Sequence, residues 1–351
     1  MLSFNFRINP ARIVFGRGAS QNISAEVEKL GGKRALILCT QNQKVNAERV
    51  AAQLGLLSGG VFAGAVMHTP VDVTEKAMQA FVETKADCIV AYGGGSTIGL
   101  GKAIALRNDA AQVVIATTYA GSEVTPVLGE TENGIKRTRS DARILPETVI
   151  YDPELTLELP VKVSVASGLN AIAHAVEGLY AQDRNPISSL LAVEGLRSMS
   201  EALRLIVKQP GDIEARSLAL YGAWLCGTVL GVVGMSLHHK LCHVLGGSFN
   251  LPHAETHAAI LPHSIAYNAR AAASELAPAA ALFEDDLPGG LYDLAETLCA
   301  PRSLCELGLA ESDLDRASDI AVSNPYWNPE EVTRDGIRAL LQRAWAGHRP
   351  N

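Results

Sequence analysis

The stretch ADCIVAYGGGSTIGLGKA, residues 86–103, joins a continuous apolar run to three glycines and then to a helical pattern. Such apolar runs are typical of strands buried on both faces of a parallel sheet. Glycine backbone can approach a pyrophosphate closely, and the N-terminus of the next helix offers free N–H groups. The stretch therefore predicts an α/β fold with a phosphate-binding loop at Gly93, Gly94, Gly95 and Ser96, where Ser96 caps the helix or bonds a phosphate oxygen. A tight turn is the alternative, and the pattern is not the G-x-G-x-x-G of ordinary Rossmann dehydrogenases.

Strand and helix patterns alternate over the first 155 residues and give way to helices alone after Asp152-Pro153. Two further apolar runs, predicted to be strands, lie at residues 34–40 and 112–116. Helical patterns lie at residues 45–54 and 73–84. The later helices are expected at residues 167–181, 188–208, 212–245 and 255–273. Because 351 residues usually form two domains, we predict a Rossmann-like α/β domain with a parallel sheet over residues 1–155 and an all-α domain over residues 156–351.

Composition narrows the class of protein. Hydrophobic residues make up 48% of the chain and charged residues 19%, as in a compact globular enzyme. The net charge of −7 argues against a nucleic-acid partner. The N-terminus alternates like a strand rather than a signal peptide, and no run of 18 apolar residues suggests a membrane span. The 6 cysteines contain no C-x-x-C pair, so we expect reduced thiols in a cytoplasmic protein.

Two further loops are expected at the same edge of the sheet as the glycines. The segment ATTYAGSEVTP follows a strand and carries the short hydroxyl side chains Thr117, Thr118 and Ser122. Open α/β folds bind ligands at the carboxyl ends of their strands, so these residues and the glycine loop together predict a dinucleotide site. The 34–40 strand ends at Thr40 rather than at an acid, which would bond the ribose 2′-OH and repel a 2′-phosphate. We therefore expect activity with both NADH and NADPH.

Histidines gather in LHHKLCHVLGGSFNLPH, residues 237–253. His239 and His243 are four residues apart, so they share one face of a helix. Upstream, SGLNAIAHAVEGLYA gives Asn170 and His174 the same spacing, with Glu177 one turn beyond. The pattern is typical of a metal site or a proton-transfer site.

His253 follows Pro252 at the start of a further helix, where a side chain is easily aimed into a cleft. Core histidines without a chemical role are the alternative interpretation. We favour that alternative for His238, which points off the paired face, and for His263, which follows a proline in an apolar helix.

In this order the motifs resemble the iron-containing alcohol dehydrogenase superfamily. The resemblance covers nearly the whole chain and rests on the glycine triplet, TTYAGSEVTP, DPELT with the following Leu159-Pro160, SGLNAIAHAVEG and HKLCHVLGGSFNLPHA. It implies the dehydroquinate synthase-like fold, in which an α/β dinucleotide-binding domain is followed by a helical domain, with the active site in the cleft between them. It also implies a homodimer.

The superfamily holds its metal with one Asp and three His, at positions that correspond here to Asn170, His174, His239 and His253. A neutral amide is a poorer ligand than a carboxylate, although three histidines and a carbonyl can still hold zinc. Gly99 stands where the superfamily usually has an acid after the glycine loop. With SNPYWNPEEVT near the C-terminus, these departures resemble the maleylacetate reductase branch. That resemblance implies NAD(P)H-dependent reduction of maleylacetate to 3-oxoadipate in bacterial breakdown of aromatic compounds, with no metal favoured.

Roles follow from this resemblance. Hydride attack on an enone spreads charge into an enolate, which hydrogen-bond donors can stabilise without a metal. His243 is the first choice as proton donor or enolate stabiliser. His174, His239 and His253 are expected to line the dicarboxylate pocket as donors, some of them charged.

The pocket also needs local positive charge, because the substrate is a dicarboxylate. We expect Asn170, Lys240 and, in the basic segment GIKRTRSDAR, Lys136 to contact the substrate. Arg139 and Arg143 in that segment are expected to be solvated surface residues.

Three rival functions remain. The first is an iron- or zinc-dependent alcohol or polyol dehydrogenase of the same fold. The second is a metal-using lyase or cyclase that keeps NAD bound, and the third is a binding protein that has lost its chemistry.

Overall fold

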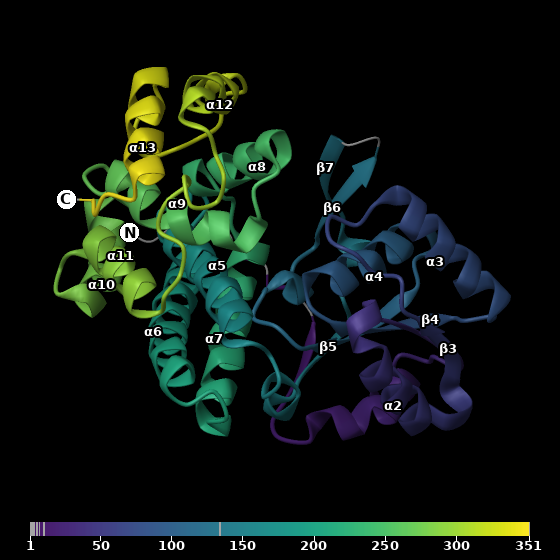
Figure 1. Ribbon diagram of the computed structural model, residues 1–351. Helices are drawn as coiled ribbons and strands as arrows, with labels where there is room; N and C mark the ends of the chain where they lie inside the picture. Colours follow the sequence, from purple (N-terminus) through teal and green to yellow (C-terminus); the bar gives the residue numbers. More distant parts are fainter. Residues whose placement is uncertain (1–3, 5, 7, 10, 133–134, 351) are drawn as a thin grey trace. The chain divides into compact units, whose positions relative to one another are not determined.

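The computed structural model describes residues 4, 6, 8–9, 11–132 and 135–350, with the backbone alone at residues 135–136 (Figure 1). The chain divides into two compact units, Ile8–Leu159 and Pro160–Asn351. The sequence analysis placed the division after residue 155.

The first unit contains a six-stranded parallel sheet in the order β1-β8-β5-β4-β2-β3. The strands are β1 Arg12–Phe15, β2 Ala35–Leu38, β3 Ser58–Phe62, β4 Cys88–Gly93, β5 Ala111–Ala116 and β8 Thr148–Tyr151. The helices are α1 Ile23–Lys29, α2 Lys44–Leu54, α3 Val71–Glu83 and α4 Gly95–Asn108. The predicted parallel α/β fold is confirmed, and the three predicted strands correspond to β2, β4 and β5.

Both faces of this sheet are covered, which explains its continuous apolar strands. Alternate side chains point to opposite faces of a strand. Ile37 and Val90 therefore pack with α1 and α2, while Leu36 and Ile89 pack with α3 and α4. All four side chains are buried. This double layer fixes where each strand ends, and thus where the loops at the carboxyl edge lie.

A two-stranded antiparallel hairpin, β6 Val127–Glu132 and β7 Ile135–Ser140, also belongs to the first unit. No strand was predicted in this basic segment, where Lys136 is expected to contact the substrate and Arg139 and Arg143 to be solvated. The Asn-Gly pair at residues 133–134 is a common hairpin turn signal, and it lies outside the described residues.

The second unit is helical in its described part, as predicted. Its helices are α5 Val161–Leu179, α6 Pro186–Lys208, α7 Ile213–Val232, α8 Leu237–Phe249, α9 His253–Asn268, α10 Ala273–Ala280, α11 Leu287–Thr297, α12 Leu314–Val322 and α13 Arg334–Ala346. Helix α7 is long and apolar enough to span a membrane, but 61% of its most apolar 18-residue stretch is buried in the protein. This is the pattern of a core helix.

Glycines let α5, α6 and α7 approach closely. A Cβ atom on Gly178 of α5 would lie 2.2 Å from Cγ1 of Val229 on α7, and one on Gly195 of α6 would lie 2.8 Å from Sγ of Cys226. A larger side chain at either glycine would force the facing side chain or the helix to shift. The contacts fix α5, which carries Asn170 and His174, against its neighbours.

The single helix expected over residues 212–245 is wrong, because the chain breaks between α7 and α8. Val233 has extended backbone with φ −133° and ψ 157°. The carboxylate of Glu177 then accepts the backbone N–H of His238 at 2.8 Å and that of His239 at 3.3 Å. A buried acid at a helix N-terminus satisfies free N–H groups and complements the helix dipole. The break therefore has a partner on α5 that sequence spacing did not reveal.

Candidate functional site

The first unit presents the predicted dinucleotide residues at neighbouring strand ends. Gly93 of β4 is in register with Ala116 of β5, and Leu38 of β2 is in register with Ala91 of β4. Helix α2 leads from β2 to its neighbour β3. Helix α4 leads from β4 to its neighbour β5, which lies in the opposite direction along the strand order. The pair β2–β4 is therefore a topological switch point, where open α/β sheets bind ligands at the carboxyl edge. Thr40 lies just beyond β2 at this edge.

The glycine loop and the hydroxyl loop pack directly against each other. The backbone N–H of Thr117 donates to the carbonyl of Gly93 at 3.0 Å, and a Cβ on Gly94 would lie 2.6 Å from Oγ1 of Thr118. Gly93 has φ 152°, which favours glycine. The hydroxyl oxygens of Thr117 and Thr118 are buried and have no hydrogen-bond partner in the described part of the chain. Unsatisfied hydroxyls are costly, so these two are available to a ligand.

Ser96 does not cap α4, because the N-cap is Gly94 and no side chain caps the helix. The contact of Ser96 with a phosphate stays a prediction. A larger residue at position 99 would require the side chain of Thr69 to move, since a Cβ on Gly99 would lie 2.5 Å from Oγ1 of Thr69.

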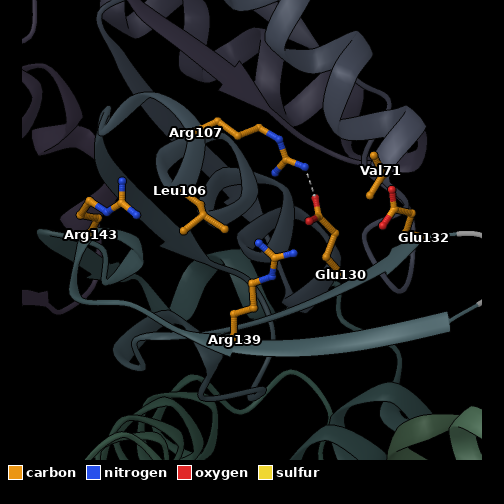
Figure 2. A pocket seen from close by; sticks show the side chains of 7 residues that line it. All are labelled: Val71, Leu106, Arg107, Glu130, Glu132, Arg139 and Arg143. Atoms are coloured by element: carbon orange, nitrogen blue, oxygen red, sulfur yellow. Dashed lines mark ion pairs between the residues drawn. The ribbon is translucent and has the colours of Figure 1, made fainter.

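A separate cavity of about 360 Å³ opens on the first unit beside the hairpin and is lined by three arginines and two glutamates (Figure 2). Arg107 pairs with Glu130 at 2.8 Å, and Arg143 pairs with Asp141 at 2.7 Å. Acidic side chains thus neutralise most of the positive charge of the arginines that line the cavity. The cavity therefore has no strong preference for a dianion. Arg139 and Arg143 are exposed, in keeping with a surface role. The side chain of Lys136 lies outside the described residues.

In the second unit, α5, α8 and α9 bring the predicted histidines together. The rings of His174 and His239 stack with centroids 5.2 Å apart. His243 is 6.3 Å from His239, while His253 is 4.5 Å from His257. His257 had no role in the sequence analysis, although it follows His253 at the same four-residue spacing as the other pairs. The structure places it in the middle of the cluster, 5.0 Å from His239.

Glu177 fixes the orientation of His239. Its carboxylate accepts a short hydrogen bond from Nδ1 of His239 and a 3.2 Å bond from the hydroxyl of Ser236. A carboxylate only accepts, so Nδ1 carries a proton, and Nε2 is an acceptor in the neutral form of the ring. That Nε2 is buried without a partner among the described residues. Burial alone raises the pKa of Glu177, but His239 and His238 lower it to about 2, so the side chain is ionised.

A second hydrogen-bond chain fixes His257. Ser264 donates its single proton to the carbonyl of Leu261 at 2.9 Å, so its oxygen accepts from Nδ1 of His238 at 3.0 Å. Nε2 of His238 then accepts from Nδ1 of His257 at 2.9 Å. The network assigns Nε2 of His257 as an acceptor, and this atom is buried without a partner in the described structure. His238 is a core histidine, as expected, but it orients a ring of the cluster.

Burial makes three of these rings neutral. It is the largest cause that lowers the pKa of His238 to about 3 and that holds the pKa values of His174 and His257 well below their ordinary range. Neighbouring imidazoles act in the same direction on all three. A charged His174, which the sequence analysis allowed, is therefore disfavoured. His243 is exposed and His253 is half-buried, so protons from solvent reach the cluster at these two residues.

Asn170 contributes a buried amide whose Oδ1 has no hydrogen-bond partner among the described residues. With His174, His239 and His253 it makes up the residues that the superfamily resemblance implies would hold a divalent ion such as zinc. The amide adds no negative charge, which distinguishes the set from a carboxylate site. Bound to these residues, a metal would polarise a substrate oxygen.

A second group that resembles a metal site consists of His238, Cys242 and His257, whose ligand atoms lie within 4.8 Å of one another. The two imidazoles already satisfy each other through the 2.9 Å hydrogen bond. Burial raises the pKa of Cys242, which keeps it a neutral thiol. We interpret this group as packed core.

Lys240 lies beside the cluster with its Nζ 5.6 Å from the centroid of the Tyr326 ring. A cation over an aromatic face is stabilised there. The side chain is half-buried, so its contact with a substrate stays a prediction.

Comparisons with known proteins agree with this geometry. Residues 10–153 match the family "Iron-containing alcohol dehydrogenase", and residues 164–345 match "Fe-containing alcohol dehydrogenase family, C-terminal". The chain belongs to the iron-containing alcohol dehydrogenase family. It is thus an oxidoreductase, and the superfamily resemblance of the sequence motifs is confirmed.

Within this family the chain is similar to maleylacetate reductases. It is 60% identical to that of a Rhizobium species over 350 residues and 54% identical to that of Burkholderia cepacia over 352 residues, in both cases covering 100% of each chain. The crystal structure of maleylacetate reductase from Agrobacterium tumefaciens covers 100% of both chains with a TM-score of 0.98 and 60% identity.

Proposed function

We propose that this chain reduces the carbon–carbon double bond of maleylacetate to give 3-oxoadipate, with NADH or NADPH as hydride donor and without a required metal. The observation that carries the proposal is the amide of Asn170, which stands in an otherwise complete histidine cluster in place of the superfamily's carboxylate. Full-length similarity to maleylacetate reductases supports the substrate. A place in bacterial breakdown of aromatic compounds, in the cytoplasm and as a homodimer, follows from the same resemblance.

The proposed reaction starts with hydride transfer to the carbon β to the ketone. The electrons of the double bond move to the ketone oxygen, so an enolate forms, and one proton then restores the ketone at the α carbon. Reduction thus consumes one hydride and one proton. Because the enolate spreads its charge over oxygen and carbon, hydrogen-bond donors suffice to stabilise it.

Asn170 suits this chemistry better than an acid. Its amide NH₂ group supplies two donors, whereas a carboxylate without a metal would repel an enolate. Glu177 and His238 hold the rings of His239 and His257 in fixed orientations. We propose that Asn170 donates to the developing oxygen charge while these rings shape the pocket.

His243 is the proposed proton donor. It lies on the same helix as His239, and its exposed side chain can recover a proton from solvent after each turnover. Imidazole titrates near neutrality, which suits a general acid. His174 and His253 complete the proposed substrate pocket with Lys240 and Lys136.

The dinucleotide is proposed to bind at the edge formed by the glycine loop, Thr117, Thr118 and Ser122. Thr40 follows β2, the strand after which NAD-specific enzymes place an acid. A threonine neither binds the 2′-OH as a carboxylate does nor repels a 2′-phosphate. Both cofactors should therefore support turnover, with a preference below about a thousandfold.

The test is spectrophotometric. Protein stripped of metal with a chelator, and checked by elemental analysis, is mixed with maleylacetate and either NADH or NADPH, and the absorbance of the reduced cofactor is followed. We expect the absorbance to fall, 3-oxoadipate to appear and added zinc or iron to give no further rate. Activity that disappears on stripping and returns with metal would contradict metal independence.

The same assay separates the rivals. The unpartnered acceptors on Asn170 and His239 are the observation that favours a metal-dependent alcohol dehydrogenase, which would oxidise diols with NAD and require the metal. A lyase that retains NAD would convert substrate without net loss of NADH.

A further inference from the structure

Lys102 is a fully buried lysine in the first unit, two turns into helix α4. No step of the proposed reaction uses it. Burying a charge is costly unless it is well paired, so its surroundings require an explanation.

The ammonium group of Lys102 bonds to a single segment of chain. It donates to the carbonyls of Ser122 at 2.6 Å and Val127 at 2.9 Å, and to the hydroxyls of Ser122 at 3.2 Å and Thr125 at 3.0 Å. All four acceptors lie between β5 and the start of β6. This is the segment that begins with Thr117 and Thr118.

The neighbourhood supports a buried charge at this point. Glu123, also fully buried, accepts the hydroxyl of Tyr151 at 2.8 Å, and its negative charge favours the ammonium form of Lys102. Burial lowers the pKa of Lys102 to about 7 and raises that of Glu123. The hydrogen bonds from Lys102 nevertheless define the path of residues 122–127.

Helix α4 begins in the glycine loop, so Lys102 links two proposed cofactor-binding segments. One end of the link is Gly94 and Gly95, where α4 starts, and the other is the hydroxyl loop. At their near edge the two loops already touch, because Gly94 faces Thr118. Lys102 fixes the far edge of the hydroxyl loop to the body of the same helix.

We propose that Lys102 is a positioning residue for the dinucleotide, which acts by holding the hydroxyl loop at a fixed distance from the glycine loop. This inference rests on the proposed cofactor site but not on the identity of the second substrate. Removing the ammonium group frees the loop without touching the cofactor. Cofactor affinity should therefore fall, while the hydride and proton steps at saturating cofactor are spared.

The test compares Lys102→Met, which keeps the apolar volume and removes the donors, with Lys102→Gln, which restores two donors on a shorter chain. NADH binding is measured by fluorescence titration without a second substrate. We expect Kd to rise at least about tenfold in Lys102→Met, as for loss of charge-assisted hydrogen bonds, and to recover partly in Lys102→Gln. Where turnover is measurable, KM for NADH should rise, while kcat should stay within about threefold of the wild-type value.

Arg107→Met is the matched control, since Arg107 lies on the same helix but bonds to Ala103 and Glu130 rather than to the hydroxyl loop. Its Kd for NADH should stay within about twofold of wild type. A Kd in Lys102→Met equal to that of the control would overturn the proposal. If Lys102→Met does not fold, Thr125→Val is used instead, because it removes one acceptor and keeps the lysine. An unchanged Kd for NADH in that variant would also overturn the proposal.

Binding without a second substrate keeps the two proposals apart. A chain that binds NADH but leaves maleylacetate unreduced would refute the proposed reaction and leave the Lys102 result intact. A wild-type chain that binds neither NADH nor NADPH would refute the cofactor site and with it the role of Lys102.

Discussion

The side chain of Asn170 has the size of an aspartate but neither its charge nor its metal affinity. Its oxygen is buried with no hydrogen-bond partner among the described residues, and it shares α5 with His174. A carboxylate at this point would add a negative charge to a cluster whose acceptors already suit a cation. In the proposed reaction, this exchange of one oxygen for nitrogen removes the carboxylate that a metal would need and supplies a hydrogen-bond donor in its place.

The first prediction is that Asn170→Asp gains metal affinity. The new carboxylate supplies charge and a stronger oxygen ligand, so zinc should bind at least about tenfold more tightly than to wild type. Isothermal titration with zinc measures this. Asn268→Asp, another buried amide of the second unit, is the control and should leave zinc affinity unchanged. Equal affinities in Asn170→Asp and wild type would show that the missing carboxylate is not what limits metal binding at this cluster.

The second prediction concerns His243 as the proton donor. His243→Ala should lower kcat by roughly 10²–10⁴, the usual contribution of a general acid, and leave the Kd for NADH nearly unchanged. Steady-state kinetics and fluorescence titration give the two quantities. His348→Ala, at a site remote in sequence on the C-terminal segment, should behave as wild type. Undiminished turnover in His243→Ala would assign the proton to another group.

At the scale of elements, α8 begins where it does because α5 supplies Glu177. The carboxylate caps the first turn of α8 and at the same time holds the ring of His239. Helix α9 contributes Ser264, which orients His238 and through it His257. Three helices are thus joined by polar contacts inside an apolar unit, and these contacts decide which ring nitrogens are left without a partner among the described residues.

The third prediction is a pH dependence of stability that comes from these buried rings. The pKa of His257 in the folded chain lies well below the ordinary value of 6.5, so below that pH the unfolded chain binds a proton that the folded chain does not. The free energy of unfolding should therefore fall as pH falls from 6.5 towards about 5, by about 1.4 kcal/mol per pH unit for each such ring. Urea unfolding at several pH values measures the slope.

His257→Gln should make that slope shallower by one such increment, whereas His348→Gln should not change it. Parallel slopes in His257→Gln and wild type would mean that His257 titrates alike in both states.

The fourth prediction concerns the contact of the glycine loop with the hydroxyl loop. Gly94→Val places a side chain where Oγ1 and Cγ2 of Thr118 lie 2.6 and 2.7 Å from an ideal Cβ, so one loop must move. NADH binding should be lost, while the helical signal of the second unit in far-UV circular dichroism remains. Gly211→Val is the control, because nothing lies within 4 Å of its Cβ position. Retained NADH affinity in Gly94→Val would rule out close approach of cofactor to this backbone.

At the scale of the whole molecule, patterns local in sequence predicted the architecture well. The buried strands and the glycine loop are contiguous in the chain, and the parallel sheet brings their ends together as expected. Four-residue spacing likewise located the paired histidines. The motifs were specific enough to identify the family before any contact was known.

Features that depend on distant partners were not predictable in the same way. The break before α8 depends on Glu177, about sixty residues upstream, and the orientation of His257 depends on Ser264 through His238. The β6–β7 hairpin was missed because its strands are polar and lack the apolar alternation that marks buried strands. Lys102 resembled an ordinary helix lysine, since only tertiary structure shows that it is buried.

The close crossing of α5 and α7 at Gly178 has a consequence for how this scaffold acquires new reactions. A side chain added at Gly178 would meet Val229, so this crossing limits the residues that α5 can carry where it packs on α7. We therefore expect new reactions on this scaffold to arise by exchange of side chains elsewhere on the helices rather than at the crossing. Laboratory evolution of this protein should accordingly accumulate its productive changes at pocket-facing positions and leave the crossing glycines untouched.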